Sequence, residues 1–132
     1  MASILIVDDE EAQRKVLHDY LAVREFTVTE AKNGVQGLEI ALSQHPDVIL
    51  LDVRMPMMDG LTMMLKLRQD EWGKKASVII LTNYDTNDVQ LMQVTAGLPS
   101  YYLMKASTPL DLVYEKIQQT IESKNNEDNS DL

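Results

Sequence analysis

Four short apolar runs, each ended by a polar residue suited to chemistry, constrain the fold of this chain most strongly. The runs cover residues 4–7, 48–51, 78–81 and 101–104, and they end, in order, at Asp8 and Asp9, Asp52, Thr82 and Lys105. Short, uninterrupted apolar runs rich in β-branched residues are typical of strands buried on both faces of a parallel sheet. Because ligands bind beyond the carboxyl ends of such strands, these polar residues are candidates for one site.

The segments between these runs have the periodicity of helices. Apolar residues recur there at three- and four-residue spacing, which places them on one helix face. The first segment carries Ala12, Val16, Leu17, Tyr20 and Leu21. A weaker strand candidate covers residues 27–31, and later helices are expected to start near Asn33, Asp59, Asp85 or Thr86, and Thr108. The pattern predicts an α/β fold with a doubly wound, five-stranded parallel sheet and five helices on its two faces.

Length and charge limit the organisation and the partners of the chain. From 132 residues we expect one domain over residues 1–123 and an acidic, disordered tail at 124–132. The net charge of −9 disfavours contact with nucleic acid or an anionic membrane, since both need a basic face. The absence of cysteine excludes disulfides and thiolate metal sites. No apolar stretch approaches the roughly 20 residues of a membrane span and the N-terminus has no signal-peptide pattern, so we expect a cytoplasmic protein.

The acidic residues at the strand ends point to metal-dependent chemistry. If the first and third strands are neighbours, the carboxylates of Asp8, Asp9 and Asp52 meet at one end of the sheet, where like charges need a cation. Mg²⁺ suits such a site because it prefers oxygen ligands and keeps waters that a phosphate can displace. Lys105 adds a positive charge and Thr82 a hydroxyl donor. Together these groups match a phosphoryl-transfer site with a carboxylate nucleophile.

With these residues in this order, the chain resembles the receiver (CheY-like) domain of two-component response regulators. The resemblance covers residues from about 3 to 122 and leaves out only the tail. It also rests on Tyr102, three residues before Lys105, and on the loop residues Met55, Pro56, Met58, Asp59 and Gly60. The resemblance implies the strand order 2-1-3-4-5 of CheY-like folds.

The resemblance also implies how the acidic residues act. Asp52 is expected to accept a phosphoryl group from a phosphohistidine on a sensor histidine kinase or phosphotransfer protein. Asp9, Asp52 and the backbone carbonyl of Arg54 are expected to bind Mg²⁺ directly, and Asp8 is expected to act mainly through a bound water. These residues make up the expected metal site and phosphoacceptor.

The resemblance also implies which residues bind the phosphoryl group and which change conformation when it is present. Thr82 and Lys105 are expected to bind phosphoryl oxygens, and Thr82 and Tyr102 to move as a switch. Their movement would remodel the face formed by the fourth helix, fifth strand and fifth helix, because a phosphoryl group stabilises only the conformer that places donors around it. That face would then bind an unidentified downstream protein or a second copy of the chain.

Several positions depart from the usual pattern of the family. Ala106 stands where most receivers have proline after the lysine, so we expect a trans bond, because a cis bond here costs about 2.5–4 kcal/mol. Asn83 stands where the family favours alanine, and its bulkier side chain is expected to narrow phosphoryl access and slow the transfer. Arg54 and Tyr84 are expected to overhang the site and hinder the hydrolytic water, which would prolong the phosphorylated state.

Three other functions compete with this interpretation of the sequence, and the residues argue against the second and the third. The first is a receiver-like binding module that works without phosphorylation, which Asn83 and Ala106 keep open. The second is a haloacid dehalogenase-like phosphatase, which needs an aspartate where this chain has Arg54. The third is a flavodoxin-like electron carrier, whose FMN phosphate the acidic residues 8–11 would repel. We therefore expect a switch and no enzyme beyond self-catalysed phosphotransfer and autodephosphorylation.

Overall fold

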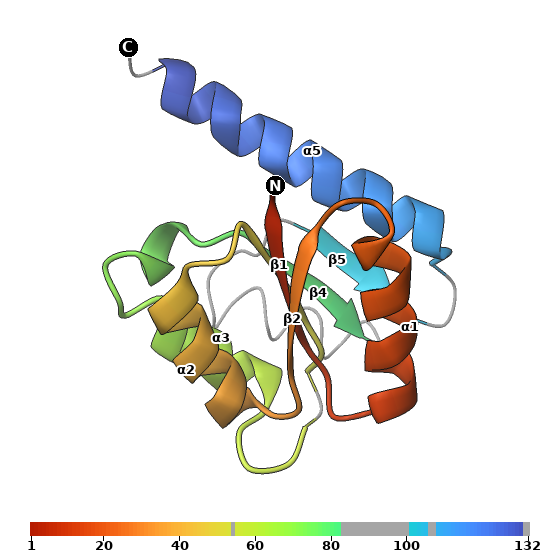
Figure 1. The fold of residues 1–132 in the computed structure, drawn as a ribbon. Helices are drawn as coiled ribbons and strands as arrows, with labels where there is room; N and C mark the ends of the chain where they lie inside the picture. The colour runs from red at the N-terminus through yellow and green to blue at the C-terminus, as the bar shows by residue number, and fades with distance from the viewer. Residues whose placement is uncertain (54, 83–100, 106–107, 131–132) are drawn as a thin grey trace.

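In the part of the chain that the structure describes, five parallel strands form one sheet (Figure 1). The computed structural model describes residues 1–53, 55–82, 101–105 and 108–130. The strands lie in the order β2-β1-β3-β4-β5, which confirms the predicted topology. Their bounds are β1 (Ser3–Val7), β2 (Thr27–Ala31), β3 (Val48–Leu51), β4 (Val78–Thr82) and β5 (Tyr101–Met104).

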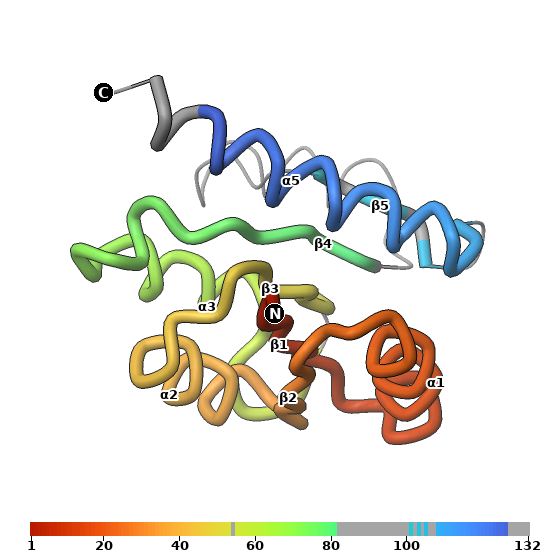
Figure 2. The backbone as a smooth tube through the Cα atoms, turned by 45° about the horizontal axis from the view of Figure 1, so that its top comes forward, coloured from red at the N-terminus to blue at the C-terminus, as the bar shows by residue number. Residues whose placement is uncertain are grey.

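Helices cover both faces of the sheet, as the sequence predicts (Figure 1, Figure 2). On one face lie α1 (Glu11–Ala22) and α5 (Leu110–Ser130), and on the other α2 (Gly34–Gln44) and α3 (Gly60–Leu67). A short 3₁₀ helix, η1 (Gly73–Lys75), precedes β4. The helix predicted to start at Asp85 or Thr86 lies outside the described residues.

Two of the inner strands, β1 and β3, show why the apolar runs of the sequence are uninterrupted. Successive side chains of a strand point to opposite faces of its sheet. On β1, Leu5 and Val7 pack into the core beneath α2 and α3, whereas Ile4 and Ile6 pack into the core beneath α1 and α5. All of these side chains are at most 1% exposed, and β3 alternates in the same way. Since both faces are covered, neither strand has a solvent-facing position for a polar residue.

Two helices begin at the residues predicted to cap them. The Asn33 side chain accepts a hydrogen bond from the Gln36 amide at 2.8 Å, at the start of α2. The Asp59 side chain accepts one from the Thr62 amide at 2.7 Å, at the start of α3. Each cap pairs a backbone N–H that lacks an intrahelical partner. The loop between β3 and α3 therefore ends at a defined point close to the strand ends.

The apolar face of α1 is narrower than the sequence predicts. Leu17 and Leu21 are buried, but Val16 is 53% exposed and Ala12 is also exposed. Consecutive residues of a helix point about 100° apart, so a helix that turns Leu17 and Leu21 to the core turns Val16 away from it. The prediction that Val16 and Ala12 belong to the buried face was wrong.

The C-terminal helix extends further than the sequence predicts. A disordered tail is expected from Lys124, but α5 continues to Ser130, and residues 131–132 lie outside the described part. A polar composition disfavours a packed core, but it does not prevent helix formation. The helix is already nucleated where Val113 and Ile117 pack into the core, and each further residue that joins it adds one backbone hydrogen bond. The Lys124 ammonium also donates to the Lys75 carbonyl at 3.0 Å. The domain boundary at residue 123 stays a prediction.

We predict that Gly60→Ala destabilises the fold by about 1–3 kcal/mol, because the added methyl group overpacks a tight contact. A Cβ atom on Gly60 would lie 2.2 Å from the backbone oxygen of Asp52, so α3 or the end of β3 must move. Urea denaturation measures the free energy of unfolding. The exposed Lys66→Ala on the same helix is the control and should change stability by less than about 0.5 kcal/mol. Equal stability of the two variants would contradict the prediction.

Candidate functional site

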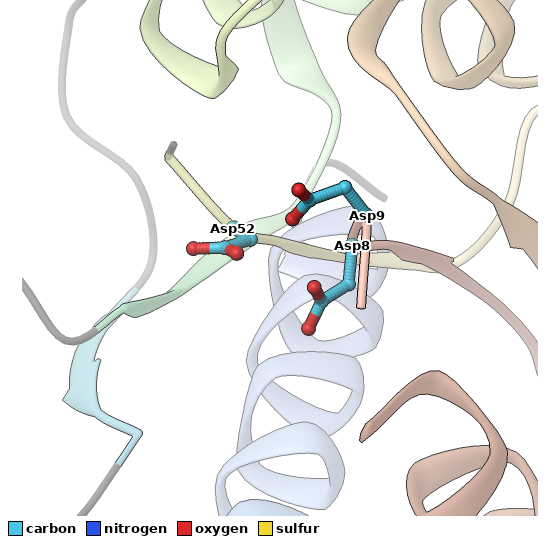
Figure 3. A group of neighbouring side chains, drawn as sticks. All are labelled: Asp8, Asp9 and Asp52. Carbon is cyan, nitrogen blue, oxygen red and sulfur yellow. The ribbon is translucent and has the colours of Figure 1, made fainter. Parts of the chain in front are cut away.

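The carboxyl ends of β1 and β3 bring three carboxylates together (Figure 3). Val7 and Leu51 are register partners on these neighbouring strands, so Asp8 and Asp52, the next residues, leave the sheet side by side. One oxygen from each of Asp8, Asp9 and Asp52 lies within 4.8 Å of the others. Asp8 is 3% and Asp52 9% exposed, whereas Asp9 is exposed. The cluster is therefore mostly buried, with one carboxylate at the solvent side.

The buried carboxylates are fixed by hydrogen bonds at both oxygens. Asp8 Oδ1 accepts from the Glu10 amide at 2.9 Å, and Asp52 Oδ1 accepts from the Val53 amide at 2.8 Å. Asp8 Oδ2 and Asp52 Oδ2 both accept from Lys105 Nζ, at 2.5 and 3.3 Å. Two backbone amides and one side chain thus hold the acidic pair in a single arrangement.

Lys105 reaches the cluster from the far edge of the sheet. It follows β5, which β4 separates from β3, so its long side chain spans the distance that a shorter residue would leave open. The side chain is only 8% exposed and forms an ion pair with both Asp8 and Asp52. This contact joins the last strand of the chain to the first and the third.

Burial sets the electrostatics of the cluster. It raises the pKa of Asp52 from 3.8 to about 6; Asp8 adds to the increase, and Lys105 and the Val53 amide oppose it. Burial alone would lower the pKa of Lys105, but its contacts with Asp8 and Asp52 outweigh that effect and raise it. Lys105 therefore stays charged, and Asp52 is largely ionised at pH 7. With Asp9 included, negative charge is in excess, and a cation would offset it.

Three of the predicted site residues lie partly or wholly outside the described part. The backbone of Thr82 ends β4 and that of Tyr102 lies in β5, but their side chains are not described. Arg54 lies outside the described residues, as do Asn83, Tyr84 and Ala106, so the Lys105–Ala106 bond stays a prediction. The described cluster consists of Asp8, Asp9, Asp52 and Lys105.

The structure adds one residue that the sequence analysis did not select. Arg14, on α1, donates from Nη1 to the backbone oxygen of Asp8 at 2.8 Å and from Nε to Glu30 at 3.1 Å. The sequence places Arg14 in the first turns of the helix that follows Asp8, and this closeness in the chain could have marked it as a contact of the site. The partner Glu30 lies on β2, however, and becomes visible only once β2 pairs with β1.

The comparison with known proteins decides the family. A sequence profile of the response regulator receiver domain matches residues 4–117. The chain belongs to this family. Receiver domains are signalling switches of two-component systems, so this receiver domain works in phosphorylation-based signalling. No helix in the described part of the chain is long and apolar enough to cross a membrane.

Individual relatives agree with this assignment. The response regulator MprA of Mycobacterium ulcerans (strain Agy99) is 37% identical over 98 residues, which are 74% of this chain and 41% of MprA. The response regulator TrrA of Thermotoga maritima, solved in complex with Mg²⁺-BeF, is 31% identical, with a TM-score of 0.78 and coverage of 91% and 99%. This receiver domain spans less than half the length of the curated relatives MprA, PleD and SrrA.

The acidic cluster of this receiver domain fits a magnesium site. The receiver domain of the sensor histidine kinase PA1611 of Pseudomonas aeruginosa PAO1 was solved with a magnesium ion coordinated in its active-site cleft. It is 27% identical to this chain, with a TM-score of 0.84 and coverage of 92% and 98%. The three carboxylates here supply the hard oxygen ligands that Mg²⁺ prefers.

We predict that Asp52→Asn stabilises the fold when divalent cations are removed by a chelator. Folding raises the pKa of Asp52, so the folded chain binds this proton more tightly than the unfolded chain. The free energy of unfolding therefore falls as pH rises from about 4 to about 6, and the loss persists above that range. The variant lacks this loss and should gain about 1–3 kcal/mol at pH 8 and little at pH 4.

Thermal melts of the parent and the variant across this pH range measure the difference. Glu122→Gln removes an exposed charge on α5 and is the control. It should leave the difference from the parent nearly independent of pH. The prediction would be contradicted if the Asp52→Asn variant were less stable than the parent at pH 8 in the presence of the chelator.

Proposed function

We propose that this receiver domain is a switch in which Asp52 accepts a phosphoryl group from a sensor histidine kinase or a phosphotransfer protein. One observation carries the proposal: Asp52 lies beside two further carboxylates while the Lys105 ammonium contacts its Oδ2 atom. A carboxylate next to a cation site and a fixed ammonium is the arrangement that phosphoryl transfer to aspartate needs.

In the proposed reaction a carboxylate oxygen of Asp52 attacks the phosphorus atom of the donor phosphohistidine. The bond between phosphorus and the imidazole nitrogen breaks, and the imidazole leaves with that electron pair. The pKa of Asp52, about 6, leaves most of the carboxylate ionised at neutral pH. Its burial at the same time removes much of the hydration that would hinder attack.

Asp9, Asp52 and the backbone carbonyl of Arg54 are the proposed direct metal ligands, and Asp8 would act mainly through a bound water. Bound Mg²⁺ would neutralise negative charge on the ligands and on the phosphoryl oxygens. Lys105 would exchange part of its contact with Asp8 and Asp52 for a phosphoryl oxygen, because that group brings nearly two negative charges to the same place.

Thr82 and Tyr102 are the proposed switch. Thr82 ends β4 opposite Met104 on the adjacent strand β5, and Tyr102 lies two residues earlier on β5, opposite Ile80, so the two residues are diagonal neighbours across the strand pair. We place the output on the face of the fourth helix, β5 and α5, where a downstream protein or a second copy of the domain would bind. The conformer that binds them is selected because the phosphoryl group stabilises it alone.

The remaining parts of the proposal concern location and turnover. We place the protein in the cytoplasm, where a kinase can transfer phosphate to it. Its own chemistry is limited to accepting the phosphoryl group and losing it to water. Arg54 and Tyr84 would slow that hydrolysis. A binding module that works without phosphorylation is the alternative that the following test distinguishes.

We predict that acetyl phosphate with Mg²⁺ adds one phosphoryl group to the protein. Intact mass spectrometry measures the addition, which should disappear in Asp52→Asn and when the metal is chelated. Asp59→Asn changes the aspartate that caps α3, outside the cluster, and should still be labelled. Labelling of Asp52→Asn at the level of the parent, or none in the folded parent, would contradict the proposal, and the second result would favour the binding module.

A further inference from the structure

The turn after β1 contains a buried carbonyl group that needs a donor. Asp8 is 3% exposed, and its amide donates to the Ala31 oxygen at 3.1 Å. Its own oxygen lies beyond the last register pairs of β1, Val7 with Ala31 and Val7 with Leu51. A buried carbonyl without a partner costs about as much free energy as a lost hydrogen bond. The sheet ladder ends one residue too early to supply that partner.

Arg14 supplies the missing hydrogen bond. Its Nη1 atom donates to the Asp8 oxygen at 2.8 Å, and its side chain is 14% exposed. Its Nε atom donates to Glu30 Oε1 at 3.1 Å, and the other oxygen of Glu30 lies 2.8 Å from His18 Nδ1. The guanidinium of Arg14 is thus oriented by the carboxylate of Glu30, which His18 contacts in turn. A planar group with several donors suits this double contact, which a lysine cannot make with the same geometry.

We propose that Arg14, oriented by Glu30, is a positioning residue for the cation site. By holding the Asp8 carbonyl, Arg14 fixes the turn from Asp8 to Glu10 so that the carboxylates of Asp8 and Asp9 face Asp52 before a cation arrives. Without this hydrogen bond the Asp8 carbonyl would turn toward water, and both carboxylates would move with the backbone. Arg14 contacts neither the cation nor the phosphoryl group in this proposal.

A positioning role and a purely electrostatic effect of Arg14 predict opposite changes in Mg²⁺ affinity when Arg14 is replaced. Arg14 is a cation near a cation site, so removing its charge should strengthen Mg²⁺ binding if it acted only through its field. A positioning role predicts weaker binding, because the ligands lose their preformed arrangement. Residues that orient metal ligands typically change metal affinity by about 10- to 100-fold when they are replaced. The sign of the change therefore separates the two explanations.

Isothermal titration calorimetry of Mg²⁺ into the full chain tests the proposal. We expect Arg14→Met to weaken binding by roughly 10-fold. Arg24→Met is the matched control, because Arg24 lies just beyond the other end of α1 and also donates to a backbone carbonyl, that of Tyr20 at 2.8 Å. The control should leave the affinity unchanged. Binding by Arg14→Met that equals or exceeds that of the parent would overturn the proposal.

Two further variants test the link through Glu30. Glu30→Gln keeps an acceptor for Arg14 and should weaken Mg²⁺ binding less than Arg14→Met. The double variant should bind no more weakly than Arg14→Met, because the carboxylate acts through the guanidinium. Additive losses would overturn the role of Glu30. If Arg14→Met does not fold, Arg14→Lys, which keeps the charge but not the fork of donors, carries the test with the same expected direction.

Amide hydrogen exchange without metal supplies a second readout. The Glu10 amide, which donates to Asp8, should exchange faster in Arg14→Met while amides of the buried strand β3 keep their protection. Uniformly faster exchange would indicate global destabilisation and overturn the proposal. The inference deepens the proposed function and rests on its cation site. Since Mg²⁺ affinity is measured without a phosphodonor, failure of phosphorylation in the parent would leave this comparison intact.

Discussion

The contact of Lys105 with both Asp8 and Asp52 is the interaction on which the rest of the site depends. Like charges at the ends of adjacent buried strands repel one another, and burial removes the water that would otherwise screen them. Burial is the main cause of the raised pKa of Asp52, and the charge of Asp8 adds to it. An ammonium from the far side of the sheet relieves the repulsion in part, and the remaining negative charge favours a cation. Lys105 therefore offsets enough negative charge to keep the carboxylates together, and the charge that it leaves uncompensated favours Mg²⁺ binding.

The fold holds these like-charged carboxylates close together despite their repulsion. The strands beneath the site are buried on both faces, and their last residues are joined by backbone hydrogen bonds, such as that from the Asp52 amide to the Val7 oxygen at 2.9 Å. On one side α3 starts against the backbone of Asp52, where only Gly60 fits. On the other side α1 brings Arg14 to the Asp8 carbonyl. Rigid surroundings on both sides keep the carboxylates from separating.

Most of the fold could be predicted because its signals are local. Uninterrupted apolar runs indicate strands covered on both faces, and Asn33 and Asp59 mark helix starts through hydrogen bonds to amides three residues away. The exposure of Val16 could not be predicted in this way, because only the packed structure shows that α1 turns Leu17 and Leu21, and not Val16, into the core that it shares with α5. The length of α5 was missed for a related reason, since polar composition does not prevent an established helix from continuing.

The strands, the helix starts at Asn33 and Asp59 and the polar residues at the strand ends can be deduced from the sequence, because each follows from the periodicity or chemistry of a few neighbouring residues. Which of those residues come into contact depends on the three-dimensional fold. Asp8, Asp52 and Lys105 are far apart in the chain, and strand order and register bring their atoms together. The contact of Arg14 and Glu30 with the turn of Asp8 is also a product of that pairing. Spacing along a chain identifies the candidates for a site, but only folding sets the distances between their charges.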